Sequence, residues 1–418
     1  MKVLIKQAII VDSSSPFNGQ TKDIFIENGI IRTIADTISE IADQLIEAAN
    51  LSVSIGWIDS FSHFCDPGYE HRETLETGAA AAAAGGFTDV LVLPNTSPSI
   101  QNKSQVEYII QKSKGLPVTI HPIGAISKNA EGKELAEMYD MHQSGAIAFS
   151  DGINSIQAPD ILLKALQYVL AFDGTIIQLP EDKSISPHGL VNEGIISTQL
   201  GLPGKPAIAE ELMIARDIEL VKYTNSKIHF TGISTQKGIE LINKAKAEGV
   251  KVTCSATPYH IYFCDEDLTE YDTNLKVNPP LRTKADMLAV REAVKNGEID
   301  CLASHHIPQN WDNKVCEFEY AKNGMIGLET LFGTALSVMG NLQLVVQMLT
   351  VAPRKIFNLS IPAIKEGTVA KLTLFDASIK TVFEESMIHS RSKNSAFIGK
   401  ALQGKVIGII NGDKITLN

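Results

Sequence analysis

The chain has 418 residues, enough for a large α/β barrel together with a second, smaller domain. Hydrophobic residues make up 44% of it and charged residues 20%, which excludes a disordered, collagen-like or coiled-coil protein. Because 37 Lys and Arg stand against 48 Asp and Glu, the net charge is −11, and we expect no nucleic-acid partner.

The chain carries no signal for export or membrane insertion. Its N-terminal apolar run is short and interrupted, unlike a signal peptide, and no run of about 18 apolar residues is present. The five cysteines form no Cys-x-x-Cys pair, which argues against a disulfide scaffold. We therefore expect a cytoplasmic protein without contact to a membrane.

Both ends of the chain are predicted to form β-structure. The segments KVLIKQAIIVD and DIFIENGIIRTI alternate apolar and polar residues around Asn28-Gly29, a typical hairpin turn. The tail from Glu366 has the same character. We predict one small, discontinuous β-sandwich domain formed by residues 1–52 and 366–418, beside a larger domain of residues 53–365.

The larger domain alternates short β-rich runs with longer helical runs. The predicted strands are 54–61, 88–94, 118–126, 145–151, 175–180, 227–234, 251–258 and 299–306. The predicted helices are 74–84, 101–113, 133–143, 159–172, 207–223, 236–247, 284–296, 328–338 and 341–350. Eight strands with helices between them predict a (β/α)8 TIM barrel, whose functional residues follow the carboxyl ends of the strands.

Several long blocks resemble the dihydroorotases of the amidohydrolase superfamily, in particular the long bacterial type. They are GWIDSFSHFCDPGYEHRETLETGAAAAAAGGFTDVLVLPNTSP, LVNEGIISTQLGLPGKP, YDTNLKVNPPLRTKAD, GMIGLETLF and SRSKNSAFIGKALQGKV. The resemblance covers nearly the whole chain. It implies a barrel of the metal-dependent amidohydrolase type and a place in pyrimidine biosynthesis.

The resemblance also implies a reaction, the reversible hydrolysis of the cyclic amide dihydroorotate to carbamoyl-aspartate by a zinc-activated hydroxide. The family pattern requires His-x-His-x-Arg after the first strand. It also requires an Asp after the fourth strand, a His after the fifth and sixth, and an Asp opening the Asp-His-Ala-Pro-His stretch after the eighth.

This chain departs from that pattern at most positions. Phe61 replaces the first His ligand and Cys65 replaces the Arg, whereas His63 and Asp151 are retained as vestigial metal ligands. Gln178 and Gly232 stand where the family pattern places the metal-binding His residues after the fifth and sixth strands.

In the stretch after the eighth strand, SHHIPQ, His305 replaces the catalytic Asp and Gln309 replaces the later His. A catalytic zinc needs at least three protein ligands and lowers the pKa of its bound water. We therefore predict a pseudoenzyme without a cofactor, in which no catalytic residue is assigned.

Three alternatives stay open at this point. His63, Cys65, Asp151 and His305 could form a rebuilt zinc site in an active dihydroorotase or another cyclic amidohydrolase. The vestigial pocket, with Asn95, Asn278 and Cys65, could serve a small-molecule sensor; Asn95 resembles the family's substrate-binding Asn. Finally, a non-catalytic barrel could be a scaffold for aspartate transcarbamoylase, and family resemblance also implies a homodimer.

Overall fold

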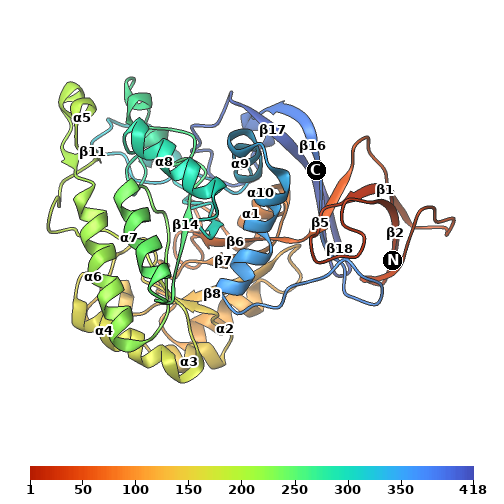
Figure 1. Cartoon of the computed structure of the whole chain (residues 1–418), viewed down its shortest axis with the longest axis horizontal. Coiled ribbons are helices and arrows are strands. Elements are labelled where there is room, and N and C mark those ends of the chain that lie inside the picture. The colour runs from red at the N-terminus through yellow and green to blue at the C-terminus, as the bar shows by residue number, and fades with distance from the viewer.

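The computed structural model describes residues 1–418 and contains a barrel of eight parallel strands (Figure 1). In spatial order the strands are β6 (Trp57–Ser62), β7 (Phe87–Val92), β8 (Thr119–Gly124), β9 (Ala148–Phe149), β10 (Ile176–Gln178), β13 (Ile228–Phe230), β14 (Val252–Ala256) and β15 (Cys301–Leu302). A parallel bridge between Ser62 and His306 brings the last strand to the first. The predicted fold class and all eight predicted barrel strands are confirmed.

Helices surround the barrel as predicted. They are α1 (Leu75–Ala84), α2 (Lys103–Lys112), α3 (Met138–Gln143), α4 (Pro159–Tyr168), α6 (Ile208–Thr224), α7 (Gln236–Ala247), α8 (Lys284–Lys295), α9 (Leu331–Met339), α10 (Leu342–Leu349) and α11 (Val351–Ile356). Short 3-10 helices are η1 (Lys128–Ala130), η2 (Val169–Phe172), η3 (Asp265–Leu268), η4 (Thr273–Leu275), η5 (Trp311–Asn313) and η6 (Glu385–Met387). None of the helices combines the length and apolar composition that crossing a membrane requires.

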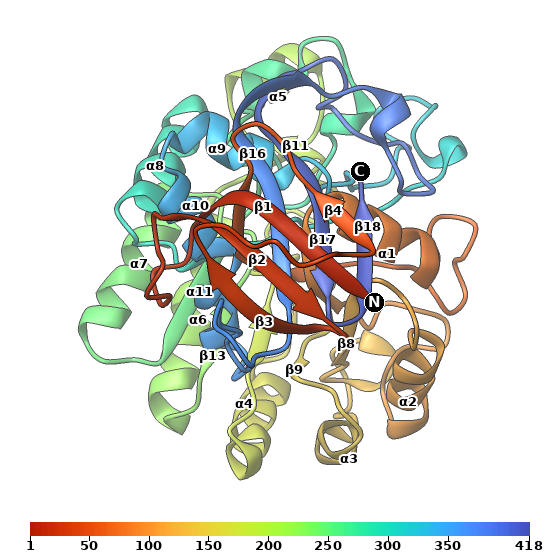
Figure 2. The same cartoon turned by 90° about the vertical axis from the view of Figure 1, so that its right-hand side faces the viewer.

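The two ends of the chain build one further sheet (Figure 2). Its strands are β1 (Lys2–Ile10), β2 (Thr21–Glu27), β3 (Ile30–Ala35), β4 (Gln44–Ile46), β5 (Ser52–Ile55), β16 (Lys371–Val382), β17 (Ala401–Asn411) and β18 (Lys414–Leu417). Asn28 and Gly29 form the expected hairpin turn, since both have positive φ angles, 50° and 75°. β5 pairs antiparallel with β16, so the N-terminal and C-terminal strands are hydrogen-bonded to each other.

The terminal sheet and the barrel share an aromatic contact. Trp57, at the start of β6, is fully buried, and its ring lies 4.6 Å from Phe332 of α9 and 5.5 Å from Phe375 of β16, between centroids. Its indole nitrogen donates a hydrogen bond to Ser54 Oγ in β5. The first barrel strand is therefore held against the terminal sheet by both apolar and polar contacts.

One inserted segment, residues 190–205, was not predicted. It contains β11 (Val191–Asn192), α5 (Ile195–Leu200) and β12 (Gly204–Lys205), and it extends away from the barrel between β10 and α6 (Figure 1). β11 and β12 pair only with each other, as a two-stranded parallel sheet. This segment carries Lys205 to the carboxyl ends of the barrel strands, where the candidate site lies.

Candidate ligand-binding site at the barrel mouth

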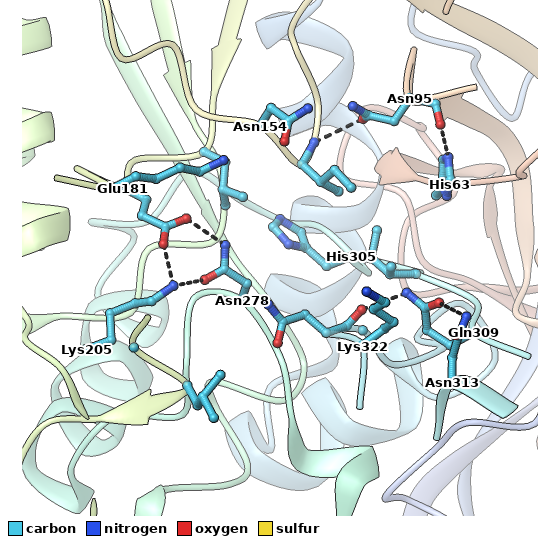
Figure 3. A pocket seen from close by; sticks show the side chains of 18 of the residues that line it. His63, Asn95, Asn154, Glu181, Lys205, Asn278, His305, Gln309, Asn313 and Lys322 are labelled. Atoms are coloured by element: carbon cyan, nitrogen blue, oxygen red, sulfur yellow. Dashed lines mark hydrogen bonds and ion pairs between the residues drawn. The ribbon is translucent and has the colours of Figure 1, made fainter. Parts of the chain in front are cut away.

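A cavity of about 1140 Å3 opens at the carboxyl ends of the barrel strands. Loops after β6, β7, β9, β10, β14 and β15 contribute to its wall, together with the segment 190–205. Figure 3 shows His305 near the middle of the labelled side chains, between His63 and Asn95 on one side and Glu181, Lys205 and Asn278 on the other. This is the place where barrel enzymes carry their active sites.

Phe61 and His305 form an aromatic stack in the mouth. Their ring centroids are 4.3 Å apart and the planes are inclined by 26°. His305 Nε2 is 2.7 Å from Thr231 Oγ1, so a hydrogen bond fixes the other end of the imidazole. Burial and the neighbouring His260 and His229 lower the pKa of His305 well below its ordinary value, and the ring is therefore neutral near pH 7.

Gly232 makes room for this stack. A Cβ atom at this position would lie 2.7 Å from His305 Cε1, inside van der Waals contact. Its φ angle of +72° also favours glycine. The space that a histidine side chain at position 232 would enter is therefore filled by His305.

Both ring nitrogens of His63 already have partners. Nε2 lies 2.9 Å from the carbonyl oxygen of Asn95, which can only accept, so Nε2 carries the proton. Nδ1 then accepts a hydrogen bond from Arg72 Nη2 at 3.0 Å. Burial, followed by the charge of Arg72, lowers the pKa of His63 to about 3.

Cys65 does not line the cavity, contrary to the prediction that it belongs to the vestigial pocket. β6 ends at Ser62, and Cys65 has a φ angle of 61°, so the alternation of an extended strand no longer applies to it. Its thiol is buried 3.2 Å from His63 Nδ1. Burial raises the pKa of this thiol to about 12, so it is not a thiolate ligand.

Asp151 is turned toward the neighbouring strand. One carboxylate oxygen accepts from the backbone N–H of Ser127 at 2.9 Å, and the other accepts from the Ser127 hydroxyl. The side chain is buried and lies outside the cavity wall, and burial raises its pKa to about 6. The retained acid thus anchors the loop after β8.

Gln178 is not the residue that the fifth barrel strand directs into the mouth. Its side-chain amide donates to Asp217 of α6 at 3.1 Å, on the outer side of the strand. Ile177 packs in the barrel interior with Phe61, and Leu179 lines the cavity. Side chains alternate between the two faces of a strand, so the residue that faces the mouth is Leu179 and not Gln178. The predicted position of the lost His ligand was therefore wrong by one residue, and an apolar side chain stands there.

Asn95 and Asn278 do line the cavity, but each is engaged by the protein. Asn95 donates to the carbonyl of Asp151 at 2.9 Å and accepts from the N–H of Ile153 at 3.0 Å. Asn278 donates to Glu181 at 2.9 Å and accepts from Lys205 Nζ at 2.9 Å. Both amides therefore position loops of the cavity wall.

Glu181 and Lys205 complete this second network and were not predicted. They form an ion pair, with side chains only 11% and 10% exposed. Burial alone would raise the pKa of Glu181, but the Lys205 ammonium and Asn278 hold it below its ordinary value. Glu181 could have been predicted as a site residue because it directly follows a predicted barrel strand. Nothing in the sequence placed Lys205 beside it.

Comparisons with known proteins agree with the architecture. A family model described as dihydro-orotase-like matches residues 52–238. A dihydroorotase of Syntrophus aciditrophicus (strain SB) is 38% identical over 97% of this chain and 97% of that protein, and one of Acetivibrio thermocellus is 40% identical over 99% and 98%. The chain belongs to the dihydroorotase family.

Solved structures outside the dihydroorotases share the fold. An L-hydantoinase (dihydropyrimidinase) from Arthrobacter aurescens superimposes with a TM-score of 0.83 at 23% identity, covering 100% of this chain and 96% of that one. A dihydropyrimidinase from Brevibacillus agri gives a TM-score of 0.81 at 19% identity, covering 100% and 95%. At these identities the likeness is one of fold alone.

The mouth of this dihydroorotase-family barrel does not fit a catalytic zinc. Neither nitrogen of His63 has a free lone pair, both oxygens of Asp151 bind Ser127, and Cys65 is a buried thiol. No group of three or more His, Cys, Asp or Glu side chains is positioned to hold a metal ion. The rebuilt site of His63, Cys65, Asp151 and His305 is therefore not assembled.

Arg72 is a further mouth residue that sequence reasoning missed. Its guanidinium lines the cavity and donates to His63 and, at 3.2 Å, to the carbonyl of Pro308. It lies in a block that resembles the family, but the sequence carries no sign that its side chain reaches His63. A cation thus contacts one of the two retained metal-ligand positions of the dihydroorotase pattern.

Proposed function

We propose that this member of the dihydroorotase family is a pseudoenzyme that works without zinc. The observation that carries the proposal is the stack of Phe61 on His305 in the place of a metal centre. Dihydroorotate hydrolysis in the family needs water activated by a metal, and the residues of this mouth supply no set of three ligands.

The position of the family's catalytic Asp also lacks a strong proton acceptor. The family's catalytic Asp is His305 here, and its Nε2 is committed to Thr231 at 2.7 Å. Its lowered pKa makes it a weak base. A general base works best with a pKa near the operating pH, so His305 does not replace a carboxylate in this role.

For the biological role we propose a scaffold in pyrimidine biosynthesis, with aspartate transcarbamoylase as the partner and a homodimer as the form of this chain. Support comes from the full-length similarity to dihydroorotases, which retains the barrel and the terminal sheet while the mouth has changed. We also propose a cytoplasmic location, because all five cysteines are free thiols, as is usual in a reducing compartment.

The first experiment measures turnover and metal content together. The protein is purified without chelator, zinc is determined by elemental analysis, and hydrolysis of dihydroorotate and cyclisation of carbamoyl-aspartate are followed with and without added zinc. We expect no stoichiometric metal and no turnover, with the Acetivibrio thermocellus dihydroorotase as the positive control. Turnover at ordinary enzyme rates, about 1–1000 per second, contradicts the proposal.

A chelator provides a separate readout. A bound metal stabilises the folded state in proportion to its binding, so its removal lowers the melting temperature. We expect EDTA to leave the melting temperature unchanged, as measured by differential scanning calorimetry. A drop of several degrees would reveal a structural metal.

The scaffold role is tested with aspartate transcarbamoylase from the same cell. Sedimentation velocity of the two purified proteins, alone and mixed, should show a new, faster species in the mixture. Unchanged sedimentation of both components refutes this partner but leaves the absence of catalysis standing.

A further inference from the structure

A second cavity lies at the amino ends of the barrel strands, at the opposite end from the mouth. Its volume of about 390 Å3 suits a small ligand, since ligand cavities typically span about 300–1000 Å3. Asp89 and His121 line it from the first halves of β7 and β8. Arg354 of α11, Lys371 of β16 and residues of the segment 359–369 that connects these two elements complete its wall.

Asp89 and His121 point into the barrel. Leu91 and Ile123, two residues further along the same strands, belong to the apolar cluster of the barrel interior, and side chains two residues apart share a face of a strand. A polar layer therefore lies at the amino end of the barrel, next to the apolar interior. This end of a TIM barrel ordinarily serves stability, so a charged cavity here needs an explanation of its own.

The cavity carries more positive than negative charge. Asp89 is the only carboxylate that lines it, and it pairs with both Arg354 and Lys371, at 2.8 Å each. Neither cation forms a salt bridge with any other carboxylate. Two cations against one carboxylate leave an excess of one positive charge, on a chain whose overall net charge is −11.

Asp89 cannot neutralise both cations, because its two oxygens are already saturated. Oδ1 accepts from Lys371 and from His121 Nε2, whereas Oδ2 accepts from Arg354 and from the Thr88 hydroxyl. Burial alone would raise the pKa of Asp89, but the hydrogen bond of His121 and the charges of Lys371 and Arg354 hold it below its ordinary value. The carboxylate is therefore ionised and the surplus charge stays with the cations.

Arg354 has buried donors without an acceptor. Its side chain is only 2% exposed, and of its five guanidinium N–H groups one donates to the carbonyl of Thr350 at 3.1 Å and one to Asp89. The other three have no acceptor in the protein. A buried donor without a partner costs stability, and an anion in the cavity would supply the missing acceptors.

Lys371 and the apolar part of the wall complete the binding features. The Lys371 side chain is 23% exposed, and Asp89 is the only acceptor for its ammonium group. Much of the remaining wall is apolar and consists of Leu359, Ile361, Pro362, Ala363 and Val369. A molecule with one anionic group and a short apolar body matches this combination.

We propose that the amino end of the barrel binds a small organic anion, whose single carboxylate or phosphate group is held by Arg354 and Lys371 and whose apolar part contacts the segment 359–369. This site lies at the other end of the barrel from the mouth and does not depend on the loss of catalysis. A guanidinium offers planar donors that suit both carboxylate and phosphate, so the two chemistries are separated by experiment.

The test is isothermal titration calorimetry of the full chain with pentanoate, monobutyl phosphate and the neutral pentanamide. We expect heat of binding from at least one anion, none from pentanamide, and weaker binding at higher salt because Lys371 is partly exposed. Binding of pentanoate alone assigns a carboxylate, binding of butyl phosphate alone a phosphate, and binding of both a site for either group. No binding of either anion, or equal binding of pentanamide, overturns the proposal.

A charge-neutral variant locates the site. Lys371→Gln should weaken binding about tenfold, as expected for the loss of one charge-assisted hydrogen bond. Lys246→Gln is the matched control, because Lys246 is 24% exposed and paired with Asp300 at 2.6 Å but lies on α7, outside this cavity. It should bind like the wild type. Equal affinity of Lys371→Gln and the wild type places the anion elsewhere and overturns the proposal.

A second pair of variants leaves the ion pairs of Asp89 in place. Val369 lines the cavity and is 56% exposed, so Val369→Glu adds a carboxylate to the wall that competes with the ligand. We expect it to weaken binding by at least about tenfold, whereas Val369→Gln, of the same size without the charge, should keep the affinity. Equal affinity of these two variants contradicts the site.

The two proposals fail in different ways. Turnover of dihydroorotate contradicts the pseudoenzyme and leaves the site at the amino end intact. Unchanged affinity in the Lys371 and Val369 variants contradicts this site alone. Melting curves of each variant, compared with the wild type, separate lost binding from lost folding.

Discussion

The residues Phe61, Gly232 and His305 depend on one another at the mouth. His305 stacks on Phe61, and its Cε1 atom occupies the space into which a side chain at position 232 would extend. Because interiors are close-packed, the three residues cannot be exchanged independently. The altered mouth is therefore a packed aromatic layer rather than an empty metal site.

This packing predicts the effect of a single methyl group. Gly232→Ala places a Cβ atom 2.7 Å from His305 Cε1 at a φ angle of +72°. We expect it to lower the free energy of unfolding by about 2–4 kcal/mol, from overpacking together with backbone strain. Urea unfolding followed by circular dichroism measures the loss.

The control is Gly249→Ala, where φ is +81° but no atom lies within 4 Å of the added Cβ. This variant should lower the free energy of unfolding only through backbone strain, by about 1 kcal/mol. The double variant with Gly232→Ala and His305→Ala should lose less stability than the two single variants lose in sum, because removal of the imidazole makes room for the added methyl group. Strict additivity would show that the two residues do not meet.

His63 gives the chain a pH dependence. The folded state lowers its pKa from 6.5 to about 3, so between these values the unfolded chain binds a proton that the folded chain does not. The contribution of His63 to stability is therefore complete above pH 6.5 and falls as the pH drops, by up to about 1.4 kcal/mol per pH unit.

His63→Gln removes this titration. The stability difference between wild type and variant should narrow as the pH falls from about 7 to 4, in urea unfolding at each pH. Other titrating groups, such as Asp151, are common to both proteins and largely cancel in the difference. A difference that stays constant over this range would mean that His63 is not buried in its neutral form.

At the residue scale, the sequence predicted which side chains are chemically unfit for zinc but not where they point. Gln178 and Leu179 show the reason, since a shift of one residue along a strand turns a side chain from the cavity to a helix. Cys65 and His305 have positive φ angles, 61° and 44°, which tertiary packing imposes and which no local pattern indicated.

Among the elements, the segment 190–205 forms a wall of the cavity and is held there by apolar packing and by buried polar contacts. β11 and β12 pair only with each other, and Lys205 connects them to Glu181 and Asn278 of the barrel loops. Arg282 adds a hydrogen bond to the carbonyl of Lys205 at 3.0 Å. A buried ion pair thus attaches an extended segment to the barrel.

Lys205→Met should loosen the attachment of this segment to the barrel loops. It leaves Glu181 buried without its cation, and removal of one partner from a buried pair costs about 3–5 kcal/mol. We expect a loss of that size in urea unfolding, and faster amide hydrogen exchange confined to residues 190–205. Lys128→Met, which breaks an ion pair whose side chains are 59% and 71% exposed, should leave the stability nearly unchanged.

The same segment marks the limit of prediction at the element scale. The eight barrel strands and the helices between them were predictable because their apolar residues recur with strand and helix periods. α5 is six residues long and β11 and β12 are two residues each, and none of them belongs to the regular alternation of strands and helices that predicts the barrel. Their structure depends on contacts with distant loops.

For the whole molecule, the buried Trp57 makes the barrel and the terminal sheet one packing unit. Its indole contacts Phe332 of the barrel layer and Phe375 of the sheet. Asp89 of β7 adds an ion pair with Lys371 of β16, 2.8 Å between charged atoms. We infer that the two parts unfold together.

Fluorescence tests this cooperativity, because the chain has two tryptophans and the other, Trp311, is 71% exposed. In a Trp311→Phe background, emission reports Trp57 alone, and its unfolding transition should coincide with that of the far-ultraviolet circular dichroism. Trp57→Ala should cost about 3–5 kcal/mol, from the cavity it leaves. Separate transitions in the parent background would show that sheet and barrel melt independently.

The pairing of β5 with β16 has a consequence for synthesis on the ribosome. Ser52 of β5 is opposite Phe375 of β16, so the strand that pairs with β5 is synthesised more than 300 residues later. At about 5–20 residues per second, that delay is on the order of 15–65 seconds. Throughout it the nascent chain displays an unpaired strand edge, which attracts other chains and calls for chaperone protection until translation ends.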